Sequence, residues 1–508
     1  MDAGQAYATQ SRVQQTLNDH GNMTERKEYT FFAPAGSPSL VRTFNYTYLA
    51  HTNYTSRHIW NRPETVTVTK AGGSPLTLVT NYYDNYVGMG MPSGVRQHDS
   101  AAYPNTFAYR GNVTSSTGLG RTINMSYDAT GNMLTSADAY GHSASQTMAS
   151  ANNFAAPSSM TAGSLSSSFT WNGGNQMTVS TGPNSATSLA SYDSYLRPAS
   201  RTAPNGSVTT STYTATTTVA KTGTRYIKST VDGFGRTKFV ESGYDTGSGQ
   251  VPLAIVATEY APCACSPMGK VWRTSLPYAS GGTQRWTEYV YDALGRTLQV
   301  KQPINSGTSA VWGTTTYLYE GATVKVTDPA TKWKLHENDA QGNLKKVTEP
   351  KPGGGGTYVS DYTYSELGKL LTTTMTRPAK GTGNGTNMTQ TRAWVYDGST
   401  QRLTSMTTPE TGTYSGGVPV NGTTSFTYNT DGTVYEKLDP KGQRLRYGYD
   451  TDGRVTSTRR FLSGGSEDTC ARVDYYHSSQ TFDAGLARTR RDGWRRRQRV
   501  VRGPGRGR

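Results

Sequence analysis

The chain has 508 residues and a formal net charge of +16, with 33% hydrophobic residues, 17% charged residues and 56 glycines. So few apolar residues exclude a thick globular core, and so few charges exclude the high-charge profile of a disordered chain. No stretch approaches 18 consecutive apolar residues, which excludes a membrane-spanning helix. A thin sheet, wetted on one or both faces, fits this composition.

The N-terminal residues show no targeting signal, because residues 1–5 lack the basic and apolar regions of a signal peptide. A repeat motif is already present from Leu17. We therefore expect the chain to be part of a larger protein. Within it, we expect residues 1–120 to hold degenerate β repeats and residues 121–482 to hold the main repeat array.

One sequence frame, Tyr-Asp-x-x-Gly-Arg, recurs along the chain and is clearest at residues 127–132, 291–296 and 449–454. Recurrence of a fixed frame indicates a repeat architecture in which each copy is one structural unit. Looser copies begin at Leu17, Trp171, Tyr192, Val231, Asn338, Tyr364, Tyr396 and Tyr428.

Each unit is predicted to be a β-hairpin. Residues 286–291 alternate and are rich in aromatic and β-branched types, as a strand with two unlike faces requires. Asp followed three residues later by Gly is typical of a type I turn, which Gly can close with a bulge. A second turn follows the next strand, as at residues 439–442, and Tyr428 to Tyr449 spans two strands and two turns.

These repeat positions are predicted to be structural and not catalytic: Asp closes the turn, and Tyr stacks on its counterpart in the next unit. The predicted positions are Tyr127, Asp128, Gly131, Tyr192, Asp193, Asp232, Gly235, Arg236, Tyr291, Asp292, Gly295, Arg296, Tyr396, Asp397, Tyr449, Asp450, Gly453 and Arg454.

The fold is expected to be all-β, with hairpins stacked into a spiral sheet or shell and little helix. A lone hairpin is marginally stable in water, so neighbours must supply its pairing and burial. A β-propeller is the alternative, but its blades repeat every 40–50 residues or so with regular spacing, whereas the units here vary in length. Unpaired edges of such a sheet also predict self-association or poor solubility.

No catalytic, cofactor or metal site is predicted. The sequence lacks a Gly-x-Ser-x-Gly elbow, a phosphate-binding loop and a His-Glu-x-x-His helix. Cys263 and Cys265 would project from one face of a strand, which leaves packing, a disulfide or a metal as their roles, and packing is favoured. Exposed aromatics such as Trp286 and Trp394 offer stacking platforms for a sugar, although strand packing explains them too.

The C-terminal residues 483–508 are predicted to be an Arg/Gly-rich disordered tail. Residues 485–508 hold ten Arg and one Asp, so they carry most of the excess charge. A basic arm of this kind can bind nucleic acid. Translation out of frame is the favoured alternative, because the Tyr/Thr/Asn-rich composition stops near Phe482, and a nucleic-acid partner is therefore not expected.

From about Leu17 to Phe482 the chain resembles the bacterial RHS, or YD-repeat, family. The resemblance rests on the recurring frame and on the segment 260–270, followed by Pro277-Tyr278 and Tyr289-Val290-Tyr291-Asp292. Residues 468–473 are similar to the same members. Family members with toxins end in a self-cleavage region and a variable domain, and nothing resembling these follows Phe482. Residues 439–442 share only an Asp-Pro-x-Gly pattern with that region, and a turn explains it.

The resemblance implies a β-strand shell that encapsulates or presents a toxin or effector domain, in a secreted or cell-surface protein. It implies as partners that effector domain or the rest of the same shell, with no enzyme activity and no cofactor in this part of the chain. The alternative function is an adhesin-like surface that binds cell-surface glycan through exposed aromatics.

Overall fold

The computed structural model describes residues 8–263, 265–303, 312–377, 388–415, 418–477 and 494–496. The predicted tail therefore lies outside the described residues except for residues 494–496. Among the described residues, no helix has the length and apolar character that crossing a bilayer would require.

The described chain is built almost entirely of strands. Up to the middle of the chain these are β1 (Val13–Leu17), β2 (Met23–Tyr29), β3 (Leu40–Tyr48), β4 (Pro63–Lys70), β5 (Pro75–Tyr83), β6 (Val113–Gly118), β7 (Arg121–Tyr127), β8 (Met133–Asp138), β9 (Ser143–Met148), β10 (Pro157–Ala162), β11 (Leu165–Trp171), β12 (Met177–Thr181), β13 (Thr187–Tyr192), β14 (Pro198–Thr202), β15 (Val208–Tyr213), β16 (Thr217–Thr222), β17 (Arg225–Val231), β18 (Thr237–Asp245) and β19 (Gln250–Cys263).

The second half continues with β20 (Ser266–Ser275), β21 (Trp286–Tyr291), β22 (Thr297–Pro303), β23 (Trp312–Glu320), β24 (Thr323–Thr327), β25 (Trp333–Asn338), β26 (Leu344–Pro350), β27 (Thr357–Tyr364), β28 (Leu370–Arg377), β29 (Met388–Tyr396), β30 (Leu403–Ser415), β31 (Val418–Tyr428), β32 (Val434–Leu438), β33 (Arg444–Tyr449), β34 (Val455–Phe461), β35 (Val473–His477) and β36 (Trp494–Arg496). The helical elements are α1 (Thr52–Thr55), η1 (Ser150–Asn152) and η2 (Thr469–Ala471).

All of these strands belong to one antiparallel sheet, in which each strand pairs with the next one along the chain. The predicted all-β fold is therefore confirmed, and the unbroken pairing excludes the propeller alternative. Pairing also continues from β6 to β7 across residue 120, where the sequence suggested a division; that division remains a prediction.

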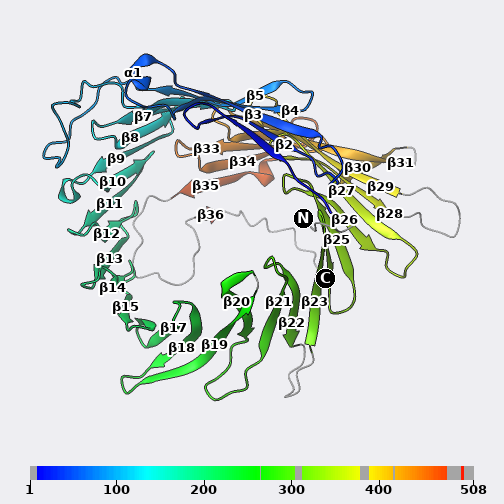
Figure 1. The fold of residues 1–508 in the computed structure, drawn as a ribbon. Helices are drawn as coiled ribbons and strands as arrows, with labels where there is room; N and C mark the ends of the chain where they lie inside the picture. The colour runs from blue at the N-terminus through cyan, green and yellow to red at the C-terminus, as the bar shows by residue number, and fades with distance from the viewer. Residues whose placement is uncertain are drawn as a thin grey trace, which may run out of the picture.

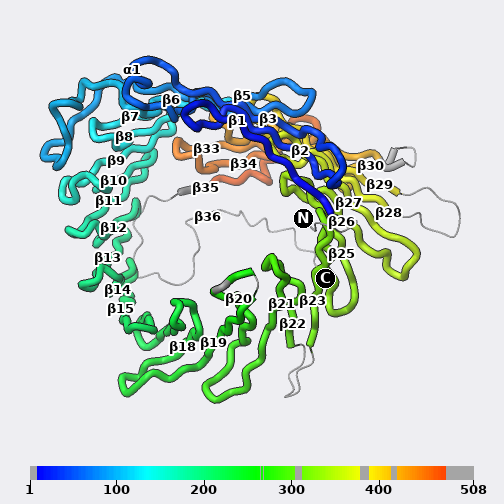
Figure 2. Tube along the Cα trace, in the orientation of Figure 1, coloured from blue at the N-terminus to red at the C-terminus, as the bar shows by residue number. Residues whose placement is uncertain are grey.

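The sheet winds around an axis, and its later strands return to the level of the first (Figure 1). In the view of Figure 1, β2 to β5 and β30 to β34 lie toward the top, β25 to β28 lie at the right, and β17 to β22 lie at the bottom. The tube in Figure 2 shows the same path without a crossover. We call the strands before β25 the first coil and the strands from β25 onward the second coil.

Strand ends at the repeat turns carry β-bulges. The pairing register shifts between Val290 and Tyr291, and between Gly448 and Tyr449, just before the turn Asp. A bulge adds one residue to a strand and increases the local twist. A bulge that recurs with the sequence frame therefore helps to make the sheet curl.

The sheet has little core. Val68, Ala129 and Tyr226 are among the few apolar side chains of the described residues that are almost fully buried. The Tyr54 side chain of α1 is also buried, close to the loop that holds Asp84. There Asp84 accepts hydrogen bonds from the backbone N–H groups of Arg110 (2.8 Å) and Gly111 (2.6 Å). The low apolar content thus reflects a wall one sheet thick.

The repeat rim and the seam as the candidate functional site

The topology gathers every repeat turn on one edge of the sheet. Since consecutive strands are antiparallel, connections that follow odd-numbered strands lie on one edge, and those that follow even-numbered strands lie on the other. We call the first edge the repeat rim and the second the opposite rim. The repeat rim holds the turns at residues 18–22, 128–132, 172–176, 193–197, 232–236, 292–296, 339–343, 365–369, 397–402, 429–433 and 450–454.

The turn after Tyr291 shows how one repeat closes. One carboxylate oxygen of Asp292 accepts the backbone N–H groups of Leu294 (3.0 Å) and Arg296 (2.8 Å). The other accepts Nε of Arg296 at 2.6 Å. Gly295 has φ +80°, a conformation that other residues rarely adopt. The same arrangement of Asp and Arg recurs at Asp193/Arg197, Asp232/Arg236 and Asp450/Arg454.

The charge state of these aspartates fits a structural role. Hydrogen bonds from the Arg197 side chain lower the pKa of Asp193, and Arg236 does the same for Asp232. At Asp292, burial raises the pKa, but the bonds from Arg296 outweigh it and the net shift is downward. A carboxylate held ionised below its usual range accepts hydrogen bonds well and is a poor proton carrier near neutral pH.

Most repeat tyrosines tie their hairpin to the preceding one through the hydroxyl group. Tyr291 donates to the backbone carbonyl of Val271 at 2.8 Å, and burial raises its pKa. The same contact is made by Tyr48, Tyr83, Tyr127, Tyr192, Tyr213, Tyr260, Tyr319, Tyr364, Tyr428 and Tyr449, and by the indole N–H of Trp171.

We expected one repeat tyrosine to stack on the next, but in the structure a guanidinium group lies over the tyrosine ring instead. The Arg236 guanidinium lies 4.2 Å from the ring centre of Tyr260, and Arg296 lies 4.6 Å from that of Tyr319. The repeat arginine therefore pairs with its own Asp and covers the tyrosine of the next unit. At these two units, a guanidinium from the preceding turn therefore lies over the tyrosine ring.

Replacing Tyr291 with Phe keeps the ring and removes the donor to the Val271 carbonyl. We expect the free energy of unfolding to fall by about 1 kcal/mol, as measured by urea denaturation. Tyr82→Phe is the matched control, because the Tyr82 side chain is 56% exposed. Equal losses in the two variants would show that the hydroxyl contact at Tyr291 contributes nothing.

The second coil rests on the first along a seam that joins the two rims. Repeat-rim turns of the second coil contact opposite-rim segments of the first coil, in the same order along the chain. The contacts are Gln341 with Tyr29, Glu366 with Arg42, Thr400 with Gly120, Asp431 with His142 and Asp452 with Ser164. The three hydrogen-bonded pairs, Ser164–Asp452, Tyr29–Gln341 and Arg42–Glu366, are 288, 312 and 324 residues apart, which measures one turn of the spiral.

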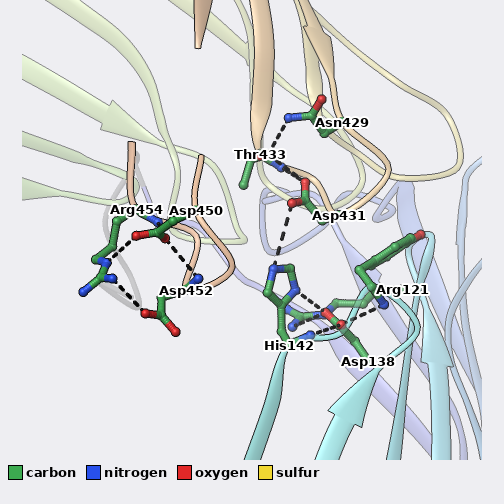
Figure 3. A network of polar contacts seen from close by, with 10 residues as sticks. Arg121, Asp138, His142, Asn429, Asp431, Thr433, Asp450, Asp452 and Arg454 are labelled. Atoms are coloured by element: carbon green, nitrogen blue, oxygen red, sulfur yellow. Dashed lines mark hydrogen bonds and ion pairs between the residues drawn. The ribbon is translucent and has the colours of Figure 1, made fainter. Parts of the chain in front are cut away.

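Asp452 makes the most complete contact of the seam. Its carboxylate accepts the Ser164 backbone N–H at 3.0 Å and the Ser164 hydroxyl at 2.7 Å. Arg454 also reaches this carboxylate, at 2.9 Å (Figure 3). A Cβ atom on Gly163 would lie 2.2 Å from the carboxylate, so the close approach requires glycine there. The bonds from Ser164 lower the pKa of Asp452.

A second polar cluster spans the seam at His142 (Figure 3). Nδ1 of His142 lies 2.9 Å from Asp138 of the first coil, and Nε2 lies 3.9 Å from Asp431 of the second coil. The Asp138 side chain is 1% exposed and also binds Arg121 at 3.1 Å. Burial raises the pKa of Asp138, but hydrogen bonds from His142 and the backbone lower it to about 2.

The predicted positions lie in a row along the repeat rim and do not converge on a pocket. Gly131, Gly235 and Gly453 have positive φ in their turns. Asn132 takes the place of Arg beside Asp128. At Asp397 the turn is one residue longer, and hydrogen bonds from Thr400 and Ser399 lower the pKa of the carboxyl group.

The described residues contain no group of three or more potential metal-ligating side chains.

Cys263 and Cys265 form a disulfide, so the favoured packing role is wrong. The prediction placed both residues in one strand. In the structure, β19 ends at Cys263 and Cys265 lies in the turn, with the two Cα atoms 5.2 Å apart. That separation falls in the usual range for a disulfide.

No protein-family model matches the chain, and no curated protein matches it. Among solved structures, TcdB2–TccC3 without its hypervariable C-terminal region aligns at 14% identity and TM-score 0.40, covering 92% of this chain and 28% of that one. The TcdB2–TccC3–Cdc42 structure aligns at 13% identity and TM-score 0.38, with 92% and 25% covered. The Photorhabdus luminescens Tc holotoxin pore aligns at 13% identity and TM-score 0.31, with 92% and 27% covered. The chain is thus similar over nearly all of its own length to structures of which it spans only 25–28%.

Proposed function

We propose that the chain is a non-catalytic wall, part of the repeat shell of a secreted or cell-surface RHS protein. The seam carries the proposal, because it turns an open sheet into a wall at least two coils high. The turn aspartates support it as well, since they are held ionised as hydrogen-bond acceptors. The wall would encapsulate or present a toxin or effector domain, and its partners would be that domain or the rest of the same shell.

A protected reporter tests this function. The full chain is produced with a small folded reporter domain at its C-terminus, and the rate at which a protease degrades the reporter is compared with that of the free domain. We expect the wall to slow degradation of the reporter. In the seam variant, which carries Asp452→Ala and Ser164→Ala, we expect the rate of degradation to rise again toward that of the free domain. Degradation at the free-domain rate in the unaltered fusion would contradict enclosure.

Asp439→Ala is the matched control for the seam variant. Asp439 holds a turn of the second coil on the opposite rim, where it accepts the N–H groups of Lys441 and Gln443 at 2.9 Å each. This variant removes the same carboxylate from a turn away from the seam. It should leave the reporter protected, so equal loss of protection in both variants would assign the effect to general destabilisation.

Glycan binding is a second candidate, because a cavity with aromatic and charged side chains lies among the described residues. An open cavity of about 390 Å³ is lined by Lys270, Trp272, Tyr289 and Asp292 among others. The Trp272 side chain is 40% exposed. Aromatic faces beside charged groups suit a sugar ring, which has apolar faces and polar edges. The Trp286 ring suggested by the sequence is not among the residues that line this cavity. The Arg273 guanidinium lies over both rings, 4.3 Å from the centre of Trp272 and 4.2 Å from that of Trp286.

Trp272→Ala should therefore abolish any glycan binding that the chain shows on a glycan array. Trp312→Ala is the control, because Trp312 is similarly exposed at 37% but lies on β23, outside the residues that line this cavity. Retained binding in Trp272→Ala would remove this cavity as the glycan site.

A further inference from the structure

The fourth position of the repeat frame varies along the chain. In the second coil, Gln341, Asp431 and Asp452 occupy it and make seam contacts. In the first coil, the earlier turns hold His20, Thr130 and Gly174 there. The last three turns of the first coil hold Tyr195, Phe234 and Leu294, which are 78%, 66% and 72% exposed. We call these three side chains the apolar tips.

The apolar tips lie in the middle of their turns, on the repeat rim of the first coil. Their turn aspartates are paired with Arg197, Arg236 and Arg296, so the rim beneath the tips is close to electrically neutral. Leu196, beside Tyr195, is a further 55% exposed apolar side chain. Apolar side chains that recur along one edge indicate an interaction surface more strongly than scattered ones do.

The seam shows which surface a fourth-position side chain contacts when a neighbouring coil is present. Every seam contact joins a repeat-rim turn to the opposite rim of another coil. Leu367 occupies the fourth position in the second coil and is half-buried there. An apolar side chain at this position is therefore compatible with a neighbouring coil.

We propose that the apolar tips dock onto the opposite rim of a second copy of this chain, in a head-to-tail contact. The two rims match because each leaves about one turn of the spiral outside the seam. On the repeat rim, this stretch is the first coil, which ends where Gln341 contacts Tyr29. On the opposite rim, it extends from the β12–β13 connection, just past the seam contact at Ser164, to the β34–β35 connection. The two stretches belong to successive turns of one spiral and therefore share its curvature.

This contact is heterologous, because it joins two different rims, so further copies can add to either end. The contact does not depend on an enclosed domain, so the chain could lack this contact and still have the proposed function. An isologous contact of tip against tip is the competing arrangement. It would close at a dimer and use only the repeat rim.

Sedimentation velocity of the full chain over a concentration series tests the proposal. The tip variant carries Tyr195→Ser, Phe234→Ser and Leu294→Ser, and its targets are exposed enough that folding should survive. The control variant carries Ile227→Ser, Leu318→Ser and Val395→Ser, at strand positions that are 57%, 50% and 54% exposed. We expect the tip variant to raise the dissociation constant at least about tenfold and the control to change it less than about twofold.

Mixing tagged wild type with the tip variant separates the two arrangements. In the head-to-tail contact, the variant keeps an intact opposite rim, so the apolar tips of a wild-type chain can bind it. Assembly stops at the variant, because the variant has no apolar tips with which to bind a further copy. In a tip-to-tip contact, wild type would not capture it. The proposal is overturned by loss of capture, by unchanged association of the tip variant, or by a wild-type chain that stays monomeric at every concentration.

Discussion

Replacing Asp138 with Ala is expected to lower the free energy of unfolding by about 2–3 kcal/mol, because it removes a buried and fully hydrogen-bonded carboxylate. The Asp138 carboxylate is almost fully buried and accepts hydrogen bonds from Arg121, His142 and two backbone N–H groups. Its removal leaves those donors without the acceptor and takes away the group that orients His142 toward Asp431. Urea denaturation followed by circular dichroism gives the change.

Hydrogen exchange of the same variant locates the damage. Because each repeat contacts mainly its neighbours, strands β8 and β9 and the nearby seam should lose protection, while β21 and β22 should keep it. Asn205→Ala is the matched control, since Asn205 caps an exposed turn of the opposite rim through the N–H of Ser207. A loss as large in the control as in Asp138→Ala would contradict a special role for the buried carboxylate.

Acid is expected to unfold the array, because many turn carboxylates share one direction of pKa shift. The pKa of Asp193, Asp232, Asp292, Asp450 and Asp452 is lowered from an ordinary value of 3.8. A carboxyl group whose pKa is lower in the folded state stabilises the fold above its unfolded value, and this contribution disappears as the pH falls through the folded value. The urea midpoint should therefore be nearly flat above about pH 5 and fall steeply below about pH 4.

An asparagine series isolates the cause of the acid effect. Asp232→Asn with Asp292→Asn removes two of the titrating groups while keeping an acceptor oxygen in each turn. The double variant should be less stable than wild type at neutral pH and should lose less stability on acidification. A wild-type urea midpoint that stays constant down to pH 3 would show that the turn carboxylates do not couple folding to protonation.

The sequence predicted the local structure of the repeat well, because turn chemistry is a short-range property. Asp292 and Gly295 indicate a closed turn from their spacing alone, and the alternation before Tyr291 indicates a strand. The antiparallel sheet follows from stacking such hairpins. The role of the Tyr291 hydroxyl was missed, because its acceptor is a backbone carbonyl, which carries no sequence signal.

The seam could not be predicted from the sequence. Its hydrogen bonds join residues 288 to 324 apart, and the number of residues in one turn of the spiral depends on strand twist, bulges and loop lengths along the whole coil. One signal was available in the fourth position of the frame, which is apolar at Phe234 and Leu294 and polar at Asp431 and Asp452. That difference has meaning only once the rims are known.

Cross-linking across the seam tests the central claim, that the chain coils on itself through its repeat rim. A variant with Ser164→Cys and Asp452→Cys, with the exposed free Cys470 replaced by Ser, is treated with a short thiol-specific bismaleimide. Ser207→Cys with Asp452→Cys, on the same background, is the control pair, because Ser207 lies on an uncovered stretch of the opposite rim. We predict that the seam pair gives an intramolecular cross-link, seen as a faster-migrating monomer band, and that the control pair does not. Absence of that band, or equal yield from the two pairs, would contradict the coiled wall.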